Sequence, residues 1–373
     1  MRNLVTILLL FLCVQVQASY ILIPMDAESQ KEHLKAYGIT YWILDKGHTA
    51  KWLLNYRGGS FLLPDSPEIQ KECRIRGVDF EVLSDSKTEQ ILAEIESPSK
   101  NMNAVVLEKA PKIAVYSPKS NLPWDDAVTL VLTYAEIPYT VVYDREVLED
   151  QLLLYDWLHL HHEDFTGQYG KFYGAYRAAP WYIEEKRRAE QLAADLGFKK
   201  VSDSKLAVAK KIRDYVIGGG FMFAMCSATD SFDIALAAEG VDICEPMFDG
   251  DPSDSNYQSK IDYDKTFAFT DFVLERDPMV YEFSSIDTTT KRRIPKESDY
   301  FTLMDFSAKW DPIPTMLCQN HTALVKGFMG QTTAFSGDQI KSNVLIMGEN
   351  KRNNEARYIH GIKGEGFYFL WRA

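Results

Sequence analysis

The sequence has little positive charge and few cysteines, and both shortages limit what the protein can be. Of 373 residues, 41 are Lys or Arg and 53 are Asp or Glu, so the formal net charge is −12 at pH 7. Binding to nucleic acid needs clustered basic side chains against the phosphates, so we expect no nucleic-acid partner. The five cysteines form no Cys-x-x-Cys motif, which argues against a zinc knuckle or a thioredoxin-like redox centre.

Long hydrophobic runs are missing beyond the N-terminus. Arg2 precedes the apolar run Leu4–Val14, and Val16 and Ala18 fit cleavage after Ala18. This run is shorter than the roughly 20 residues of a membrane-spanning helix. We therefore predict a signal peptide over residues 1–18, export to the periplasm or the extracellular space, and no transmembrane segment after cleavage. Disulfides are permitted there, and the pairing stays open among the remaining cysteines, Cys73, Cys226, Cys244 and Cys318.

Residues 19–100 are predicted to form a small α/β unit, since apolar segments of mixed periodicity fill them. Within the unit we expect a short helix that stops at Gly38 and a strand over residues 39–47. A polar, turn-rich stretch near Ser97 is typical of a linker, so the boundary with the next unit is placed at residue 100.

Residues 101–373 show a regular alternation of continuous apolar strands with amphipathic helices. The strands are expected near residues 112–118, 137–144, 155–162 and 220–225. This order is typical of a parallel sheet, and such sheets bind ligands beyond the carboxyl ends of their strands. Insertions interrupt the pattern at about 165–200 and 246–310, and strand-like segments dominate from about Thr270 onward.

Cys226 is the first candidate for chemistry, because it falls between a predicted strand and a predicted helix in "GGGFMFAMCSATDSFD". A sharp strand-to-helix turn exposes its central side chain at a helix N-terminus, where N–H groups such as that of Ser227 can stabilise an oxyanion. Small neighbours suit such a turn, and Ala224 and Ala228 are small. The alternative is a small buried side chain without a chemical role.

The stretch "HLHHED" is the second candidate and ends a predicted strand. Along a strand, His159, His161 and Glu163 share one face, while His162 and Asp164 share the other. Such a set could supply a base with an orienting acid, or could hold a metal ion for hydrolysis. We expect His161, His162 and Glu163 to line a pocket, and we name His159, His161 and His162 as weak metal candidates.

His360 is the third candidate, because it follows Cys226 in the chain and has glycines beside it in "YIHGIKGEG". Glycines let the backbone approach a ligand closely. His360 is therefore a candidate base for Cys226, although a turn histidine without a catalytic role is the alternative. His321 is a weaker candidate of the same kind.

In these segments the chain resembles the class I glutamine amidotransferase-like superfamily, through "PKIAVYSP", "YDWLHLHHEDF" and "IRDYVIGGGFMFAMCSA" in that order. The resemblance implies a flavodoxin-like parallel sheet. Over nearly the whole length the chain resembles exported bacterial proteins labelled asparagine synthetase B. Synthetase chemistry is not expected, because position 2 is Arg2 rather than the nucleophilic cysteine, and the Ser-Gly-Gly-x-Asp-Ser loop is missing. Members of that superfamily also have the elbow motif Gly-x-Cys-x-Gly, and this chain has Ala224 and Ala228 in place of the two glycines.

Two main functions stay open from the sequence, and metal-assisted hydrolysis at His159, His161 and His162 is a third, less favoured one. The first is a hydrolase of amide or related bonds that uses no cofactor. It would have Cys226 as nucleophile, His360 or His161 as base and Glu163 as orienting acid. The second is a non-catalytic module that binds a small molecule, carbohydrate or peptide. Its ligand would contact the aromatic residues of the first insertion, Phe172, Tyr173, Tyr176 and Trp181. In the hydrolase, Ser227, His162 and Asp164 would line the oxyanion site and the pocket.

Overall fold

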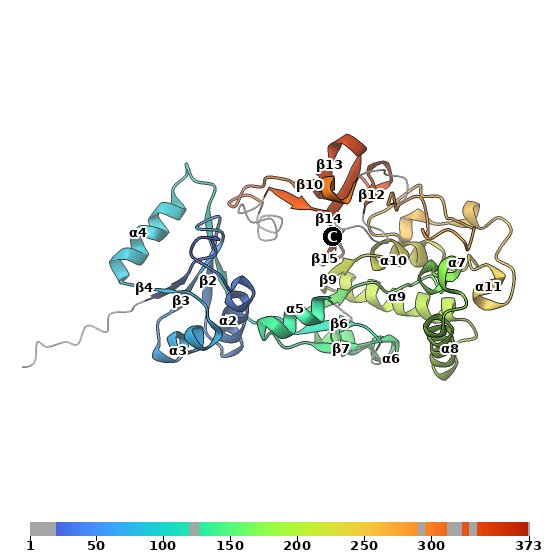
Figure 1. The fold of residues 1–373 in the computed structure, drawn as a ribbon, viewed down its shortest axis with the longest axis horizontal. Coiled ribbons are helices and arrows are strands. Elements are labelled where there is room, and N and C mark those ends of the chain that lie inside the picture. Colours follow the sequence, from blue (N-terminus) through green and yellow to red (C-terminus); the bar gives the residue numbers. More distant parts are fainter. Residues whose placement is uncertain (1–19, 119–126, 290–294, 312–322, 328–333, 372–373) are drawn as a thin grey trace, which may run out of the picture. The chain divides into compact units, whose positions relative to one another are not determined.

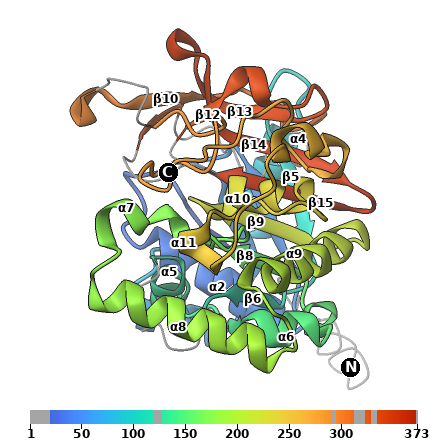
Figure 2. The ribbon, with the colours of Figure 1, turned by 90° about the vertical axis from the view of Figure 1, so that its right-hand side faces the viewer.

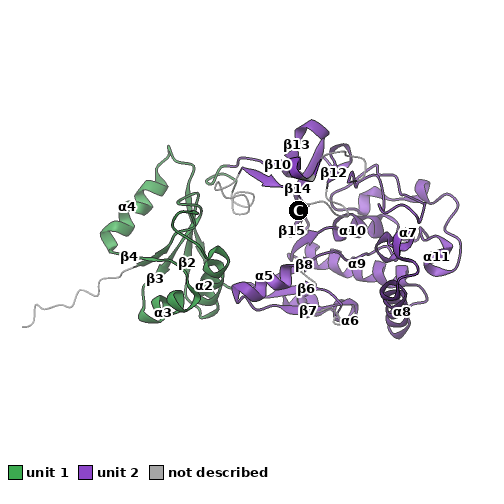
Figure 3. Ribbon diagram, in the orientation of Figure 1, with its two compact units in different colours: residues 1–110, 307–321 green, residues 111–306, 322–373 purple. Residues whose placement is uncertain are grey.

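The structure is a computed structural model, and it describes residues 20–118, 127–289, 295–311, 323–327 and 334–371. The chain forms two compact units, residues 1–110 with 307–321 and residues 111–306 with 322–373 (Figure 3). The predicted signal peptide, Cys318 and His321 lie outside the described residues. Within the described part of the chain, none of the helices combines the length and the apolar character needed to cross a membrane.

Unit 1 is an antiparallel sheet of five strands with helices on both faces. The strand order is β4-β1-β3-β2-β5. Apolar side chains of one face pack against α2 and α3, and those of the other face pack against α4. The elements are β1 (Tyr20–Ile23), α2 (His33–Asp45), β2 (Ala50–Leu54), β3 (Ser60–Pro64), α3 (Pro67–Arg76), β4 (Glu81–Leu83), α4 (Asp85–Glu96) and β5 (Asn103–Leu107).

The strand expected over residues 39–47 is wrong, because α2 continues through Gly38 to Asp45. Ala36, Ile39 and Ile43 are completely buried, and their spacing places them on one helix face against the sheet. Apolar and β-branched side chains such as these are common in strands, so the local sequence has a weak preference for strand. Burial of the helix face against β1 and β3 outweighs that preference.

The end of unit 1 also differs from the boundary placed at residue 100. Strand β5 follows the polar stretch and pairs with β2, so the unit extends to Ala110. Residues 307–311 return to it much later in the chain. There Lys309 donates hydrogen bonds to the last carbonyls of α4, with Nζ 3.1 Å from Glu96 O and 2.8 Å from Ser97 O. A lysine at this position satisfies carbonyls that the helix itself leaves unpaired.

Unit 2 is mixed α/β and contains a ten-stranded mixed sheet (Figure 1). Strands β7, β6, β8, β9 and β15 are parallel neighbours in that order, and antiparallel β14, β13, β10 and β11 continue the sheet beyond β15. The strands are β6 (Ile113–Tyr116), β7 (Thr140–Val142), β8 (Trp157–Leu160), β9 (Phe221–Met225), β10 (Tyr300–Leu303), β11 (Leu324–Lys326), β12 (Phe335–Ser336), β13 (Leu345–Asn350), β14 (Glu355–Lys363) and β15 (Gly366–Trp371).

The helices of unit 2 cover the sheet and build its insertions. Side chains of α6, α9 and α10 share one core with the strands. Helices α7, α8 and α11 lie together at one end of the unit (Figure 2). The helices are α5 (Ala127–Ala135), α6 (Asp144–Leu148), α7 (Tyr173–Tyr176), α8 (Pro180–Asp195), α9 (Val201–Ile217), α10 (Ala228–Ala237) and α11 (Pro246–Asp249).

A buried aspartate fixes the second insertion to the core. Asp233 of α10 is completely buried, and its carboxylate accepts hydrogen bonds from the N–H groups of Phe267 at 2.7 Å, Ala268 at 2.7 Å and Phe269 at 3.0 Å. Tyr368 of β15 donates a further hydrogen bond to Phe267 O at 2.9 Å. Irregular backbone can be buried here because side chains satisfy its polar groups.

We expect Asp233→Ala to lower the free energy of unfolding by about 3 kcal/mol or more, because it leaves buried N–H groups without acceptors. Urea unfolding of the full chain measures this. The exposed neighbour Asp264 is the matched control, and Asp264→Ala should change stability by less than about 0.5 kcal/mol. Equal losses in both variants would show that the carboxylate does not hold the insertion.

Candidate functional site

The candidate site lies where three parallel strands end side by side. Strand β8 is paired with β6 on one side and with β9 on the other. Because the three strands are parallel, the residues that follow Tyr116, Leu160 and Met225 meet at the same edge of the sheet. The structure therefore brings the Cys226 turn next to the segment that follows β8.

Cys226 occupies a strained turn between β9 and α10. Its φ is 48°, in the left-handed region that residues other than glycine seldom adopt. Its carbonyl accepts hydrogen bonds from the N–H of Thr229 at 3.1 Å and from the Thr229 hydroxyl at 2.6 Å. Ala224 and Ala228 are completely buried on either side, and Cys226 is half-buried. The thiol thus sits at the beginning of α10, where a helix leaves its first N–H groups unpaired.

Two serines of α10 and its N-cap bind the loop after β8. The Ser227 hydroxyl donates to His162 O at 2.7 Å, and the Ser231 hydroxyl donates to Glu163 O at 3.1 Å. The Ser231 oxygen also accepts the N–H of Phe165 at 3.3 Å. Ser227 is buried, so its side chain has a positioning role that sequence reasoning missed.

His161 and His162 form a contacting pair at the end of β8. Their Nδ1 atoms are 3.1 Å apart, and their rings meet edge to face with centroids 4.7 Å apart. His161 is half-buried and His162 is exposed, so an imidazole at this edge can exchange protons with solvent. His159, two residues earlier, is instead buried in the sheet, with its ring stacked on Phe223.

Glu163 is buried behind the histidine pair. Burial raises the pKa of its carboxyl from 4.5 to about 8, with Lys205 and His161 opposing the shift and Asp144 adding to it. Glu163 is therefore largely protonated at neutral pH and can donate a proton. The sequence predicted an orienting carboxylate at this position, and the raised pKa instead favours a neutral acid.

A buried polar cluster that the sequence did not reveal lies beside Glu163. Lys205 of α9 donates to Asp144 Oδ1 at 2.9 Å, to the hydroxyl of Tyr116 at 2.9 Å and to that of Tyr143 at 3.1 Å. The Tyr116 hydroxyl also donates to Asp144. Tyr143 and Asp144 directly follow β7, so they could have been identified as polar residues after a strand. Lys205 could not, because it comes from a helix distant in sequence.

Asp164, expected to line the pocket, holds the loop after β8 together. Its Oδ1 accepts the N–H and the hydroxyl of Thr166, both at 2.6 Å, and its Oδ2 accepts the N–H of Gly170 at 3.0 Å. These bonds fold the loop back on itself, which is a common role for aspartate in turns.

His360 is not brought to Cys226, so its predicted role as base is wrong. It lies buried in β14, with Nδ1 3.1 Å from Tyr368 O and its ring stacked on Phe369. Phe369 pairs with Phe223 of β9, so β15 lies between the two strands and His360 is about 10 Å from β9. Cys226 follows Phe223 by three residues, so it lies further from His360 than Phe223 does. Burial lowers the pKa of His360, which favours a neutral ring inside the sheet.

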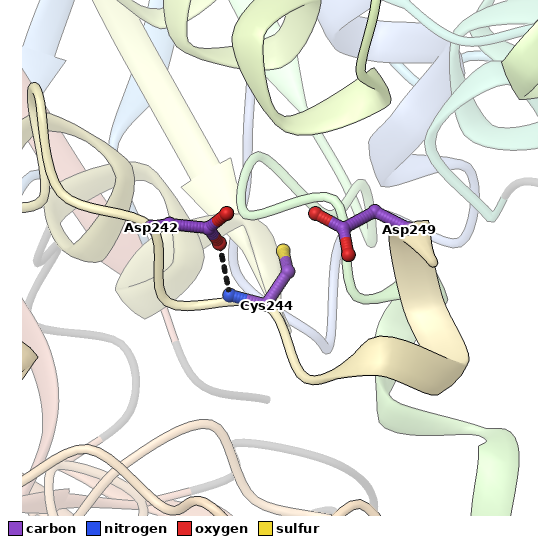
Figure 4. Close-up of side chains that lie close together, drawn as sticks. All are labelled: Asp242, Cys244 and Asp249. Atoms are coloured by element: carbon purple, nitrogen blue, oxygen red, sulfur yellow. Dashed lines mark hydrogen bonds between the residues drawn. The ribbon is translucent and has the colours of Figure 1, made fainter. Parts of the chain in front are cut away.

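A second cluster, away from the histidines, has the composition of a metal site. Among the described residues, ligand atoms of Asp242, Cys244 and Asp249 lie within 4.8 Å of one another (Figure 4). The Lys200 ammonium reaches this group, with Nζ 2.5 Å from Asp242 and 3.0 Å from Asp249. Burial raises the pKa of the Cys244 thiol, which donates to Thr166 O at 3.3 Å. A lysine therefore supplies the cation that balances these carboxylates.

The cysteines that the structure describes are free thiols: Cys73, Cys226 and Cys244. Cys73 and Cys244 are completely buried, whereas Cys226 is half-buried. Cys226 is therefore the most accessible of the described thiols.

Comparison with solved structures gives distant likenesses. No family model and no curated protein matches it. Two cytoplasmic proteins of Salmonella typhimurium are each 10% identical, with 70% of this chain and 87% of theirs aligned at a TM-score of 0.34. A GH42 beta-galactosidase is also 10% identical, with 71% of this chain and 28% of that enzyme aligned at a TM-score of 0.31. Likenesses this weak assign no function to the chain.

The pH dependence of stability tests the state of Glu163. The folded protein keeps the proton up to about pH 8, whereas the unfolded chain releases it near pH 4.5, so the contribution of Glu163 to stability falls as pH rises between these values. Glu163→Gln mimics the protonated form and should lack this fall. By pH 8 we expect the variant to gain up to about 5 kcal/mol relative to the natural protein.

Urea unfolding at pH 5 and at pH 8 measures the difference, with Glu365→Gln, an exposed position in the same unit, as control. The control should show no such dependence. A Glu163→Gln effect that is identical at both pH values would show that the carboxyl is ionised in the folded protein.

Proposed function

We propose that the chain is a cysteine-nucleophile hydrolase of amide or related bonds. The observation that supports this proposal is the positive φ of Cys226, directly after the central parallel strand β9. Such a conformation costs on the order of 1–3 kcal/mol and is typical of sites where a side chain must be held for function. In hydrolases with a nucleophile elbow, the same kind of turn exposes the attacking atom above the sheet.

The strand order supports a flavodoxin-like sheet of the class I glutamine amidotransferase-like type. Numbered by appearance in the chain, the parallel strands β6, β7, β8, β9 and β15 lie side by side in the order 2-1-3-4-5. This is the flavodoxin-like order, and its chain reversal falls between β6 and β8. The Lys205 cluster and the segment after β8 lie at that reversal, where ligands bind in such sheets.

The proposed reaction divides the chemistry among residues at this edge. Cys226 Sγ attacks the carbonyl carbon, and its proton passes to the His161–His162 pair. The N–H groups of Ser227 and the first turn of α10 stabilise the oxyanion. The pair then passes this proton to the leaving amine, the C–N bond breaks, and a thioester stays on Cys226. In the second half the pair takes a proton from water, whose oxygen attacks the thioester, and returns that proton to the sulfur, which releases the acid and restores the thiol. Glu163 keeps its proton throughout and orients the pair.

A non-catalytic binding module on the same fold is the second candidate. The observation that favours it is that exposed aromatic side chains gather in the first insertion, where Tyr176 and Trp181 are 45% and 46% exposed and their ring centroids are 5.1 Å apart. The strained backbone of Cys226 keeps the hydrolase as the first candidate. For either function we propose export through the signal peptide at residues 1–18.

Acyl transfer from p-nitrophenyl acetate to the full chain without its signal peptide tests the hydrolase. We expect an acetyl group on Cys226, found by peptide mass mapping, and continuous release of p-nitrophenolate as water hydrolyses the thioester. Cys226→Ala should abolish this turnover, and His161→Ala should reduce it about 100-fold or more.

Cys244→Ala is the matched control, because Cys244 is completely buried, and it should keep full turnover. Unchanged turnover in Cys226→Ala would contradict the proposal. Acetylation that never reaches Cys226 in the natural protein would favour the binding module.

A further inference from the structure

Four aromatic side chains from two separate insertions meet in one patch, which we call the aromatic patch: Phe172, Tyr176, Trp181 and Tyr281. The Phe172 ring has its centroid 5.7 Å from those of both Trp181 and Tyr281, and 6.0 Å from that of Tyr176. Tyr176 and Trp181 are also in contact, at 5.1 Å. The patch is therefore continuous from the α7–α8 segment to the loop that carries Tyr281.

The patch is unusually open for aromatic residues. Tyr176, Trp181 and Tyr281 are 45%, 46% and 37% exposed, and neighbouring Met279 is 56% exposed. Isolated exposed apolar residues are ordinary, but a contiguous group indicates a binding surface. Tyr and Trp suit this use because they offer large rigid faces at a small cost in conformational entropy.

Buried contacts hold the patch in place. Lys171, just before Phe172, is only 2% exposed, and its Nζ donates to Glu275 O at 3.0 Å and to Asp277 O at 3.1 Å. Burying a lysine is costly, and burial indeed lowers its pKa. Gly174 lies so close to Met279 that a Cβ at this position would be 2.7 Å from Met279 O. The two insertions are thus fixed to each other directly beneath the exposed rings.

The patch is joined to the Cys226 turn through the loop after β8. Ser227 holds the carbonyl of His162, and Asp164, two residues later, holds the N–H of Gly170, two residues before Phe172. On the other side of the patch, burial together with nearby Asp287 and Cys226 raises the pKa of Tyr281 to about 12. The hydrogen bonds of Ser227 and Asp164 therefore connect the Cys226 turn to the segment that carries Phe172.

We propose that the aromatic patch is the substrate-binding wall of the Cys226 site, and that it takes an amide whose acyl or amine part carries an aromatic ring. The wall is aromatic, its rings are inclined to one another, and the Lys171 ammonium is bound to backbone carbonyls. A planar ring can therefore pack against Trp181 or Tyr176 while the carbonyl reaches Cys226. This inference rests on the proposed function, because it takes Cys226 as the reacting group.

Alkylation of Cys226 tests the wall separately from acyl transfer. Iodoacetamide and its N-phenyl analogue, iodoacetanilide, react alike: the thiolate displaces iodide, an S–C bond forms, and the thiol proton goes to buffer. We expect iodoacetanilide to alkylate Cys226 about 10-fold faster than iodoacetamide, after each rate is divided by that of glutathione, because stacking holds the phenyl ring beside the sulfur. Rates are measured on the full chain by peptide mass mapping.

Trp181→Ala and Tyr176→Ala should bring this ratio close to one. Trp310→Ala removes an 83% exposed tryptophan from unit 1 and should keep the ratio of the natural protein. A ratio near one in the natural protein, or a ratio that Trp181→Ala does not lower, would contradict the proposed role of the patch. Self-association of the chain that Trp181→Ala abolishes would assign the patch to a second copy and also overturn it.

The two proposals fail in different ways. If acyl transfer fails but the selective alkylation holds, the hydrolase is wrong and the patch still binds aromatic rings beside Cys226. If acyl transfer proceeds but the ratio is near one, the nucleophile stands and the substrate class is wrong.

Discussion

The candidate site depends on the hydrogen bonds between the beginning of α10 and the loop after β8. Ser227 and Ser231 are buried, and each donates its hydroxyl to a carbonyl of that loop. Parallel strands place their ends at the same edge, but they do not fix the loops that follow. The two serines do so here. They set the histidine pair beside the Cys226 turn and keep Glu163 behind it.

Burial then determines the charge at this edge of the sheet. Lys205 and Asp144 form an ion pair whose remaining hydrogen bonds are made with Tyr116 and Tyr143, which lets two charges stay inside the protein. Glu163 lies within reach of both charges, and their opposing effects leave desolvation as the dominant influence on its pKa. A neutral acid next to two imidazoles is a suitable arrangement for moving protons at neutral pH.

Two groups of candidate ligands in unit 2 show why composition alone is a poor guide to metal sites. Asp242, Cys244 and Asp249 offer suitable ligand atoms, yet Lys200 binds the carboxylates from the beginning of α9. The histidines at the end of β8 looked more promising in the sequence, but His159 turns into the sheet while His161 and His162 contact each other. In both places the candidate ligands contact other side chains: Lys200 binds the two carboxylates, and the histidine rings contact Phe223 or each other.

The sequence by itself determined four of the five parallel strands (β6, β7, β8 and β9, but not the place of β15), the strand-to-helix position of Cys226 and the location of His161, His162 and Glu163 at the end of a central strand. These follow from local apolar patterns, which are strong where a strand is buried throughout. Tertiary structure decided that residues 39–45 are helical, that His360 lies two strands from β9, and that Lys205 reaches Asp144. Each of these depends on pairing or packing between segments far apart in the chain, and the free energy of such contacts is not encoded in any one stretch of sequence.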